Sequence, residues 1–565
     1  RAFYEHRAVS FVGRPCRLEE LDAHLERLQA WGFNLLRFIV TWEAIEHAGP
    51  GEYDQDYLAY LRLACQRAGE FGFTVLIDPH QDCWSRWTGG DGAPGWTLEA
   101  ANFVVGPQLH TSGAAFLHQE HGDPLPSMSW PSNYDKLGCA TMYSLFWAGD
   151  QLAPNVAPCL GGEITSSLQE LLQSSYIQSI AQVARELRDV PCVLGFETLN
   201  EPHPGWLGSV DLGEATPGPI TAGQSPVDQM QQCAGDRGPW ADGQCLWAKA
   251  GVWDPSSGRL LDPGRFRCDD WTGQCFAPFV RRFAAAIRRH MPDAVIGVCP
   301  PAFGPESRQP FPGSLPERAL WMPHFYDGVV LVGKTWNPGF GVEEPAPKAE
   351  LLGGLLPTPP VLPVFGLEAR IEAYKRQLQW KAALMGSSAA PVVLGETGVP
   401  FDLGGLAALQ QGDLEGPREA IDAHLRALEE LFLPFCWWNY TPENSHLHGD
   451  GWNGENLSIY SAENGGGRCL ESLLRPALLL CAGEPKSQCF GRADGRYRCE
   501  FDASGTGETV FFVPKLHFSR ETTRVSVTPG SAITWDEESQ LLTYRAADAG
   551  RVALDLQSVG RQGST

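Results

Sequence analysis

Two glutamates that lie far apart in the sequence follow short apolar runs. Glu201 comes shortly after residues 190–194, and Glu396 directly follows residues 391–395. Both runs are typical of buried strands. Carboxylates at strand ends suit a barrel of parallel strands, whose C-terminal rim carries the chemistry. Two carboxylates that flank one bond are what glycoside hydrolysis needs, because one protonates the leaving oxygen and the other attacks the anomeric carbon or activates water.

The neighbours of Glu201 indicate how its side chain is presented. Asn200 precedes it and Pro202 follows it. Proline lacks an N–H and restricts the residue before it to extended backbone. We therefore expect Glu201 to be extended at the C-terminal lip of its strand and to point out of the sheet end, as a general acid would. A strand that merely ends in polar loop residues would give the same local pattern, and the presence of Glu396 favours the catalytic interpretation.

Five further stretches occur in order along the chain, at residues 78–82, 84–86, 92–98, 130–134 and 451–458. Together with the Asn-Glu-Pro triplet they resemble glycoside hydrolase family 5. More closely, the chain resembles the family's branch of fungal steryl-glucosidases and glucocerebrosidases, whose relatives are the endoglycoceramidases. The resemblance covers nearly the whole chain, and it implies an eight-stranded barrel followed by a small β-sandwich.

The resemblance implies roles for the residues that match the family's motifs. Glu201 matches the acid/base and Glu396 the nucleophile of a reaction that retains configuration, with the two carboxyl groups about 5–5.5 Å apart. Arg37 matches the arginine beside the nucleophile, where a cation favours the ionised carboxylate. A buried structural ion pair is the alternative for Arg37, and one side chain can serve both purposes.

The same resemblance implies a set of substrate-binding residues. Asn200 matches the amide that hydrogen-bonds the sugar 2-OH, and His324 and Tyr326 match a His-x-Tyr motif whose spacing puts both side chains on one face of a strand. His80 matches a rim histidine, and Trp438 matches an aromatic platform for the sugar ring. Asp82 is a candidate ligand of a sugar hydroxyl, with loop structure as its alternative.

Helical and strand patterns alternate from about residue 18 to residue 439, which implies a parallel sheet. Seven strand ends carry polar or aromatic residues, so the pattern predicts a (β/α)8 barrel that lacks one strand. Residues 1–17 are too polar or too loop-like for a barrel strand. We therefore expect the first barrel strand to be missing from this chain, which would leave unpaired strand edges and an open seam.

The domain organisation predicted from these patterns has two parts. Residues 1–475 form the catalytic barrel, and residues 476–565, with their period-two alternation, form a β-sandwich. Two long tryptophan-rich insertions interrupt the barrel at 81–165 and 203–273. We expect at least two of their ten tryptophans to line the site and to cover an apolar aglycone, whereas each one taken singly is more typical of a cluster that holds its loop down.

Composition limits the partners. The net charge of −24 argues against nucleic acid and against electrostatic docking on anionic lipid. We expect no cofactor, no metal and no obligate protein partner, since a cluster at 446–450 is the one metal-like pattern and the mechanism needs no ion. Of the sixteen cysteines, Cys192, Cys299 and Cys436 lie in predicted strands and are expected to be buried free thiols, whereas those clustered in loops could form disulfides in an oxidising compartment. No signal peptide is visible, which favours a soluble protein of the cytoplasm or vacuole.

These features predict a retaining β-glucosidase that acts on a glycolipid with a glucose head group and a sterol or ceramide aglycone. Transient contact with a membrane surface is compatible with such a substrate. The alternative is an endoglycoceramidase that releases an intact oligosaccharide, which needs an open cleft instead of a closed pocket. A catalytically inactive glycolipid-binding barrel is disfavoured because both Glu201 and Glu396 are present.

Overall fold

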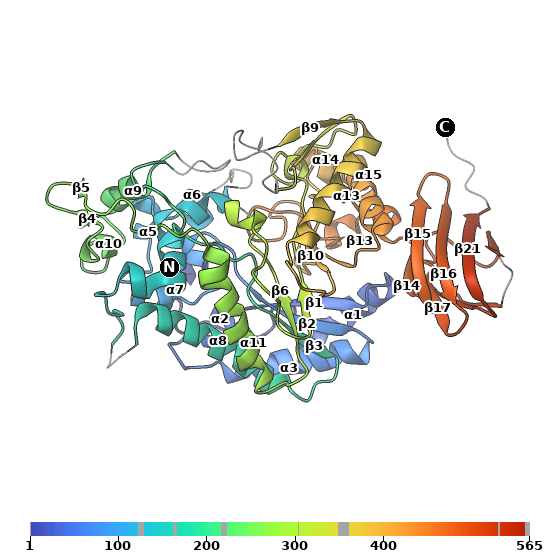
Figure 1. Cartoon of the computed structure of the whole chain (residues 1–565), viewed down its shortest axis with the longest axis horizontal. Helices are drawn as coiled ribbons and strands as arrows, with labels where there is room; N and C mark the ends of the chain where they lie inside the picture. Colours follow the sequence, from blue (N-terminus) through green and yellow to red (C-terminus); the bar gives the residue numbers. More distant parts are fainter. Residues whose placement is uncertain are drawn as a thin grey trace.

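The computed structural model of the chain describes residues 2–122, 129–161, 166–215, 223–302, 304–347, 361–528 and 532–559. Figure 1 shows a large α/β body and, at its right, a pair of C-terminal sheets. The N-terminus lies in the large body, and the chain ends at the sheets. The two bodies have separate hydrophobic cores.

Seven parallel strands within the described residues form the barrel wall. They are β1 (Leu35–Thr41), β2 (Thr74–His80), β3 (Val193–Glu197), β6 (Val295–Val298), β7 (Ala319–Trp321), β10 (Leu394–Thr397) and β11 (Phe435–Trp437). The first five pair in that order, and β10 pairs with β11. Single bridges at Trp321–Val392 and His324–Glu396 join the two groups of strands. The strands follow the apolar runs closely because both faces of a parallel sheet are buried.

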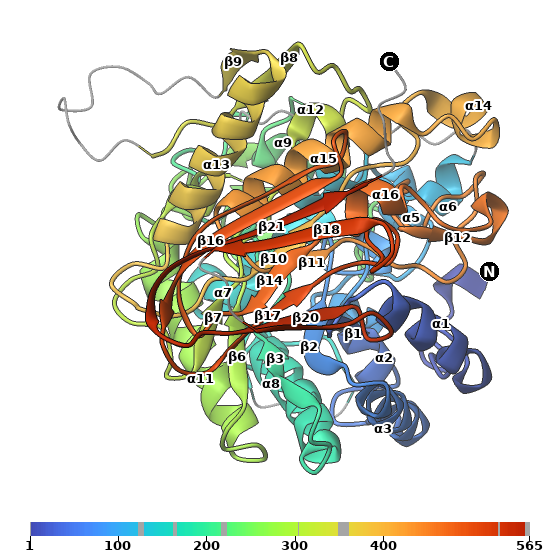
Figure 2. The same cartoon turned by 90° about the vertical axis from the view of Figure 1, so that its right-hand side faces the viewer.

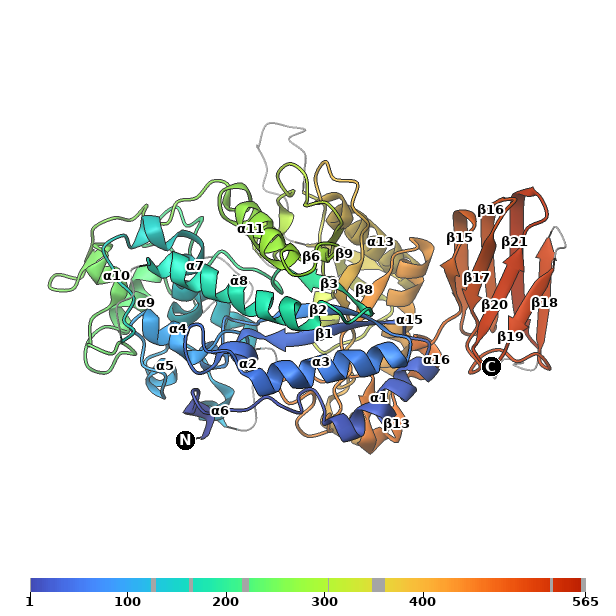
Figure 3. The ribbon, with the colours of Figure 1, turned by 90° about the horizontal axis from the view of Figure 1, so that it is seen from below.

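Helices connect successive strands and cover the outside of the barrel. They include α1 (Leu18–Ala30), α3 (Gln55–Glu70), α8 (Leu168–Leu187), α11 (Ala277–Arg288), α13 (Leu367–Ala383) and α15 (Glu415–Glu430). Figure 3 shows α1 and α3 running beside β1. The apolar face predicted for the first helix is confirmed, since Leu21, Leu25 and Leu28 are buried.

The barrel has an unpaired seam between β1 and β11. Residues 2–17 contain the short 3-10 helix η1 (Ala2–Tyr4) and no strand, as the sequence predicted. Within the described residues β1 pairs with β2 alone, and no ladder joins it to β11. A cavity of about 220 Å³ lies at the seam, lined by residues 35–39 and 435–440.

The two insertions build a compact flank of the barrel. Their main helix is α7 (Leu137–Leu152), and shorter ones such as α4 (Gly95–Ala100), α9 (Pro226–Gln232) and α10 (Leu246–Lys249) surround it. All ten insertion tryptophans are buried, with at most 5% of any one exposed. Many pack edge-on against other rings, such as Trp147 against Trp271. Aromatic burial therefore explains most of the tryptophan content of these loops.

The C-terminal residues form two four-stranded antiparallel sheets, which confirms the predicted sandwich. One sheet holds β14 (Ala477–Leu480), β17 (Glu508–Phe512), β20 (Leu541–Arg545) and β19 (Ile533–Asp536), and the other holds β15 (Gly483–Gly491), β16 (Arg496–Ser504), β21 (Ala549–Ser558) and β18 (Thr523–Thr528). Figure 2 shows both sheets in front of the barrel. Alternate residues of β16 are buried, because successive side chains of a strand point to opposite faces.

None of the helices in the described ranges combines the length and the apolarity needed to cross a bilayer. All sixteen cysteines lie within these ranges, and each is a free thiol in the structure.

A buried arginine fastens the sandwich to the barrel. Arg475 bonds both carboxylate oxygens of Glu429 on α15, at 2.5 and 2.9 Å, and Asp422 at 2.5 Å. It also donates to the carbonyl oxygen of Phe490 on β15 at 2.8 Å. The same side chain thus reaches both bodies.

We expect Arg475→Ala to lower the free energy of unfolding by about 3 kcal/mol, because the substitution leaves buried carboxylates without their cation. Calorimetry or urea unfolding measures the effect. Arg545→Ala is the matched control, since Arg545 pairs with Glu508 but is 73% exposed, and it should cost less than about 1 kcal/mol. Equal effects of the two substitutions would contradict the interpretation.

Candidate active site

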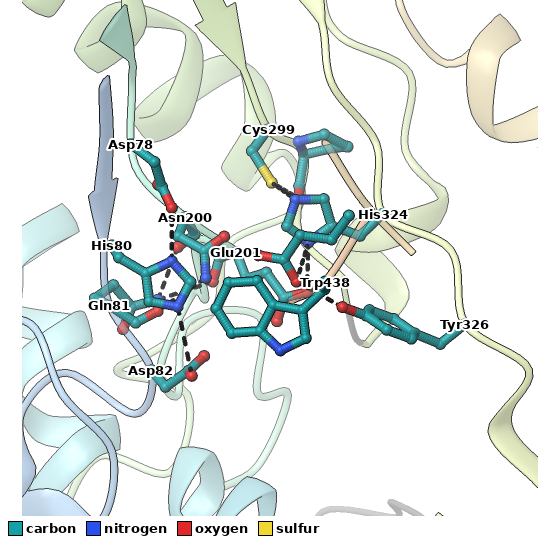
Figure 4. A network of polar contacts seen from close by, with 12 residues as sticks. Asp78, His80, Gln81, Asp82, Asn200, Glu201, Cys299, His324, Tyr326 and Trp438 are labelled. Atoms are coloured by element: carbon teal, nitrogen blue, oxygen red, sulfur yellow. Dashed lines mark hydrogen bonds and ion pairs between the residues drawn. The ribbon is translucent and has the colours of Figure 1, made fainter. Parts of the chain in front are cut away.

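A cavity of about 180 Å³ opens at the C-terminal ends of the barrel strands. Eight of the nine predicted site residues line it: His80, Asp82, Asn200, Glu201, His324, Tyr326, Glu396 and Trp438. Figure 4 labels all of these side chains except Glu396 and shows them converging from different segments of the chain. The ninth, Arg37, lies behind Glu396 and is bonded to it. The structure thus brings all nine predicted residues together.

Arg37 on β1 is the centre of a buried ionic network. Its guanidinium donates to Glu197 at 2.7 Å, to Glu396 at 2.7 Å and to Oδ1 of Asn200 at 2.8 Å. A carboxylate oxygen of Asp78 lies 3.0 Å away. The Arg37 side chain is 4% exposed, so four strands meet at one buried cation. A single arginine therefore both joins the strands and sits beside Glu396.

The backbone of Glu201 differs from the sequence prediction. β3 ends at Glu197, and Glu201 lies four residues further on with a φ of +37°. The expectation of extended geometry is therefore wrong. Gln81 holds the turn by donating to the carbonyl oxygens of Asn200 at 2.8 Å and of Glu201 at 3.1 Å. These long-range bonds override the preference that Pro202 imposes, and such strained backbone is concentrated at functional sites.

Glu201 and His324 form a buried pair. Nδ1 of His324 and Oε1 of Glu201 share a hydrogen bond of 2.8 Å. Burial raises the pKa of Glu201 to about 8, and the charge of Asp82 adds to the rise. Burial lowers the pKa of His324 to about 4, outweighing the opposite effect of Glu396. At neutral pH Glu201 therefore carries a proton and the imidazole is uncharged.

Glu396 has a different environment. One of its oxygens accepts from Arg37 and the other from the hydroxyl of Tyr326 at 2.9 Å. Both donors stabilise the ionised form of the carboxylate. An oxygen of Glu201 and one of Glu396 lie within 4.8 Å of each other, and Nδ1 of His324 lies 2.8 Å from Glu201 and 3.5 Å from Glu396. A gap this short leaves no room for the bridging water that inverting glycosidases place between their carboxylates.

The segment that carries His324 and Tyr326 is irregular. β7 ends at Trp321, so the predicted placement of both residues on one strand face is wrong. One bridge to Glu396 nevertheless aligns the segment with β10. Gly395 leaves room for the imidazole, since a Cβ there would lie 2.8 Å from Nε2 of His324. Close packing on a glycine therefore fixes the ring that contacts Glu201.

One end of the cavity is polar and enclosed by aromatic rings. The His80 ring stacks on Trp438 with centroids 5.0 Å apart, and Trp438 stacks on Trp452 at 5.8 Å. Asn453 donates to Asp82 at 2.8 Å and closes the wall beside them. Burial alone would lower the pKa of His80, but its 2.8 Å contact with Asp78 holds that pKa well above the usual range. This end combines charged hydrogen-bonding groups with flat aromatic faces, as sugar binding requires.

The opposite end of the cavity is lined by α12 (Gly328–Leu331) and α13. Leu331 and Val332 contribute apolar surface there, and Gln377 and Lys381 contribute polar groups. Of the ten insertion tryptophans only Trp130 lines the cavity, so the expectation that at least two would do so is wrong. The other nine pack inside the insertions.

Several residues at the site were not predicted from the sequence. Gln81 positions Glu201, and it stands in the motif stretch 78–82, which was a usable signal. Glu455, in the motif stretch 451–458 from which the resemblance implied contacts to the sugar, accepts from Nε1 of Trp438 at 3.3 Å. Burial raises the pKa of Asp91 to about 8 against the effect of His80, and within the described residues neither of its oxygens has a hydrogen-bond partner. Lys381 lies in the last turn of α13, where nothing in the local pattern marks it as a site residue.

Three metal-like clusters occur at the site within the described residues: Glu201, His324 and Glu396; Glu197, Cys299 and His324; and His80, Asp82 and Asp91. In the first cluster Glu396 accepts from Arg37 and Tyr326, and Glu201 pairs with His324. The pattern at 446–450 serves loop structure instead, since Asp450 accepts from Asn439 and Asn444 at 2.9 and 2.7 Å.

Comparison with known proteins identifies the family. The profile described as Cellulase (glycosyl hydrolase family 5) matches residues 6–113, and the profile of the Glycoside hydrolase family 5 C-terminal domain matches residues 475–554. A glucosylceramidase of Rhizopus delemar is 32% identical over 96% of this chain and 87% of its own length. An ergosteryl-beta-glucosidase of Saccharomyces cerevisiae is 31% identical over 81% of this chain and 69% of its own.

A solved structure resembles the whole chain. Sterylglucosidase 1 of Cryptococcus neoformans superimposes with a TM-score of 0.88 at 25% identity, and the match covers 100% of this chain and 92% of that structure. Together with the barrel, the sandwich and the relatives above 30% identity, this match leads to one assignment. The chain belongs to glycoside hydrolase family 5 and is a glycoside hydrolase.

Proposed function

We propose that the protein is a retaining β-glucosidase that hydrolyses a lipid-linked β-glucoside, either a steryl β-glucoside or glucosylceramide. One observation carries the proposal. Two carboxylates lie within 4.8 Å, one protonated by burial and the other held by an arginine and a tyrosine. Divergent environments of this kind assign the acid and the nucleophile in glycosidases. The names of the relatives supply the substrate class.

The reaction then proceeds in two steps. The ionised carboxylate of Glu396 attacks the anomeric carbon while Glu201 transfers its proton to the glycosidic oxygen, and the aglycone alcohol leaves. Glu201, now ionised, takes a proton from a water molecule that attacks the glycosyl-enzyme and releases glucose. Two inversions at the anomeric carbon give net retention. His324 stays neutral in both steps. It keeps its hydrogen bond to Glu201 when Glu201 is protonated and when Glu201 is ionised.

The enclosed polar end of the cavity is the proposed glucose site. Trp438 offers its face to the sugar ring, and His80 and Asp82 hydrogen-bond its hydroxyls. Asn200 uses one amide hydrogen on the carbonyl oxygen of Gln81 at 3.1 Å, which leaves the other for the sugar 2-OH. Arg37 donates to Glu396 from behind and does not line the cavity.

The wall around the polar end of the cavity favours removal of a single glucose over release of an oligosaccharide. Trp438, Trp452 and the Asn453–Asp82 bond separate the cavity from a larger surface groove on the far side of Trp452. A longer glycan would have to pass this wall. The aglycone then extends toward Leu331, Val332 and α13, and not into the tryptophan-rich insertions.

We expect Glu396→Gln to abolish turnover, because an amide cannot form the covalent glycosyl-enzyme. Glu201→Ala should slow hydrolysis of unactivated substrates by about 10²–10⁴-fold. With an activated aryl glucoside as substrate, added azide should restore turnover by the Glu201→Ala variant and yield β-glucosyl azide. Kinetics and NMR of the product measure both outcomes.

Glu443→Gln is the control for these substitutions, since Glu443 is 77% exposed and pairs only with Arg14 among the described residues. It should retain full activity. An α-glucosyl azide, or no azide product, would show that the two glutamates have been assigned the wrong roles.

The pKa of Glu201 sets the expected pH dependence. The general acid must be protonated, so kcat/KM should fall as the pH rises through about 8, where Glu201 ionises. Asp82→Asn removes a charge that raises this pKa and should move the falling limb to lower pH. If kcat/KM of the Asp82→Asn variant falls at the same pH as that of the unmodified protein, the charge of Asp82 does not raise the pKa of Glu201.

A panel of purified steryl β-glucoside, glucosylceramide and a longer glycosphingolipid tests the proposed specificity. The enzyme should release free glucose from one or both of the first two substrates. Trp452→Ala should open the wall and raise activity on the longer glycan relative to the monoglucoside. Release of an intact oligosaccharide by the unmodified protein would instead favour the endoglycoceramidase alternative.

A further inference from the structure

A two-stranded ribbon projects from the barrel beside the aglycone end of the cavity. It consists of β8 (Phe340–Glu343) and β9 (Leu362–Phe365), which pair antiparallel. Figure 2 shows both strands at the edge of the molecule, above α13. A two-stranded ribbon is marginal alone, so it depends on packing against a neighbour.

The two faces of the ribbon differ. Gly341 and Val364 are paired and lie on the inner face, where Val364 is buried and the Arg370 side chain of α13 packs closely on Gly341. Phe340 and Phe365 are also paired, so they share the outer face, with ring centroids 5.8 Å apart. Phe340 is 38% exposed and Phe365 is 71% exposed. The outer face is thus apolar and uncovered within the described residues.

The ribbon and its surroundings concentrate exposed apolar side chains. The described residues include seventeen large hydrophobic side chains that are exposed, and five of them lie on the ribbon or beside it. Leu362 pairs with Glu343 and so shares the inner face with Val364. We call the other four the hairpin patch: Val332, Phe340, Val361 and Phe365. Single exposed apolar residues are ordinary, whereas a contiguous group of this kind marks an interaction surface.

The hairpin patch is continuous with the active-site cavity. Helix α12 contacts β8, and Leu331 at the end of α12 lines the cavity. Val332 belongs to the patch and also lines the cavity, as does Glu344 directly after β8. A molecule that leaves the cavity at this end therefore passes onto the patch.

Two charged side chains described beside the patch are neutralised within the protein. Glu343 pairs with Arg376 at 2.6 Å, and Lys334 pairs with Asp402 at 2.9 Å. The chain as a whole carries a net charge of −24, which repels anionic surfaces. A partner of this patch must consequently be bound through apolar contact and not through its charge.

We infer that the hairpin patch docks the protein on the surface of a neutral lipid bilayer, with the cavity mouth facing the lipid. The inference rests on the proposed function, because the apolar part of a glycolipid lies in a bilayer and must cross from there into the cavity. Phe340 and Phe365 insert at the headgroup level, where aromatic side chains are favoured. The glucoside then enters along Val332 and Leu331 without its aglycone crossing open water.

Flotation with phosphatidylcholine vesicles tests the docking without using activity. The unmodified protein should float with the vesicles, and the bound fraction should be the same in about 0.1 and about 1 M NaCl, since screening does not weaken apolar contact. Phe340→Ser combined with Phe365→Ser should reduce binding about tenfold or more. Leu516→Ser, at an apolar position of the sandwich that is 45% exposed, is the matched control and should float normally.

Kinetics of the same variants distinguish docking from catalysis. On bilayer-embedded glucosylceramide or steryl glucoside, kcat/KM of the double variant should fall about tenfold or more. On a water-soluble aryl glucoside it should not change, which also shows that the variant is folded. If no lipid glucoside is cleaved but the flotation result holds, the proposed substrate is wrong and the docking stands.

Three results would overturn the inference. The unmodified protein could fail to float, its binding could disappear at high salt, or the double variant could float as well as the unmodified protein. Sedimentation of the unmodified protein as a dimer that the double variant breaks would assign the patch to a second copy of the chain instead.

Discussion

The site depends on one buried cation. Arg37 neutralises or hydrogen-bonds acidic groups from three neighbouring strands, and its side chain is 4% exposed. Taking charges out of water is costly unless each is paired, so these groups are stable only together. The arrangement fixes β1, β2, β3 and β10 in register at their C-terminal ends. The same arginine donates to Glu396, which makes the stability of the barrel and the position of the proposed nucleophile two results of one ion network.

The two glutamates show how position within one cavity divides chemical roles. Glu201 has an imidazole as its close partner, and burial there favours the neutral acid. Glu396 accepts from a guanidinium and a phenol, which favour the anion. The distance between them is short, yet their hydrogen-bond partners differ. The carboxyl groups are chemically alike, and the difference in behaviour that we propose arises wholly from what surrounds them.

Much of the fold and of the candidate site could be predicted from the sequence. Buried parallel strands are continuous apolar runs, and the proposed catalytic residues follow shortly after such runs. The strands ending near Thr41, His80 and Val298 are examples. The predictions that were wrong concern features that long-range contacts determine. The φ of Glu201 is set by Gln81, more than a hundred residues away, and the tryptophans of the insertions pack on one another. Lys381 reaches the cavity only because α13 packs beside it, and no local pattern records that.

The sandwich meets the barrel at the end opposite to the active site. Gln540 donates to the carbonyl oxygen of Ala30 at the end of α1, and Gln488 donates to that of Glu429 near the end of α15. Both helices lead into the N-terminal ends of strands, whereas the loops that build the cavity leave the C-terminal ends. Insertions and sequence drift in those loops can therefore accumulate without loosening the interdomain contact. Because of this separation, the cavity loops can diverge toward new aglycones during evolution while the barrel and the sandwich keep their structure.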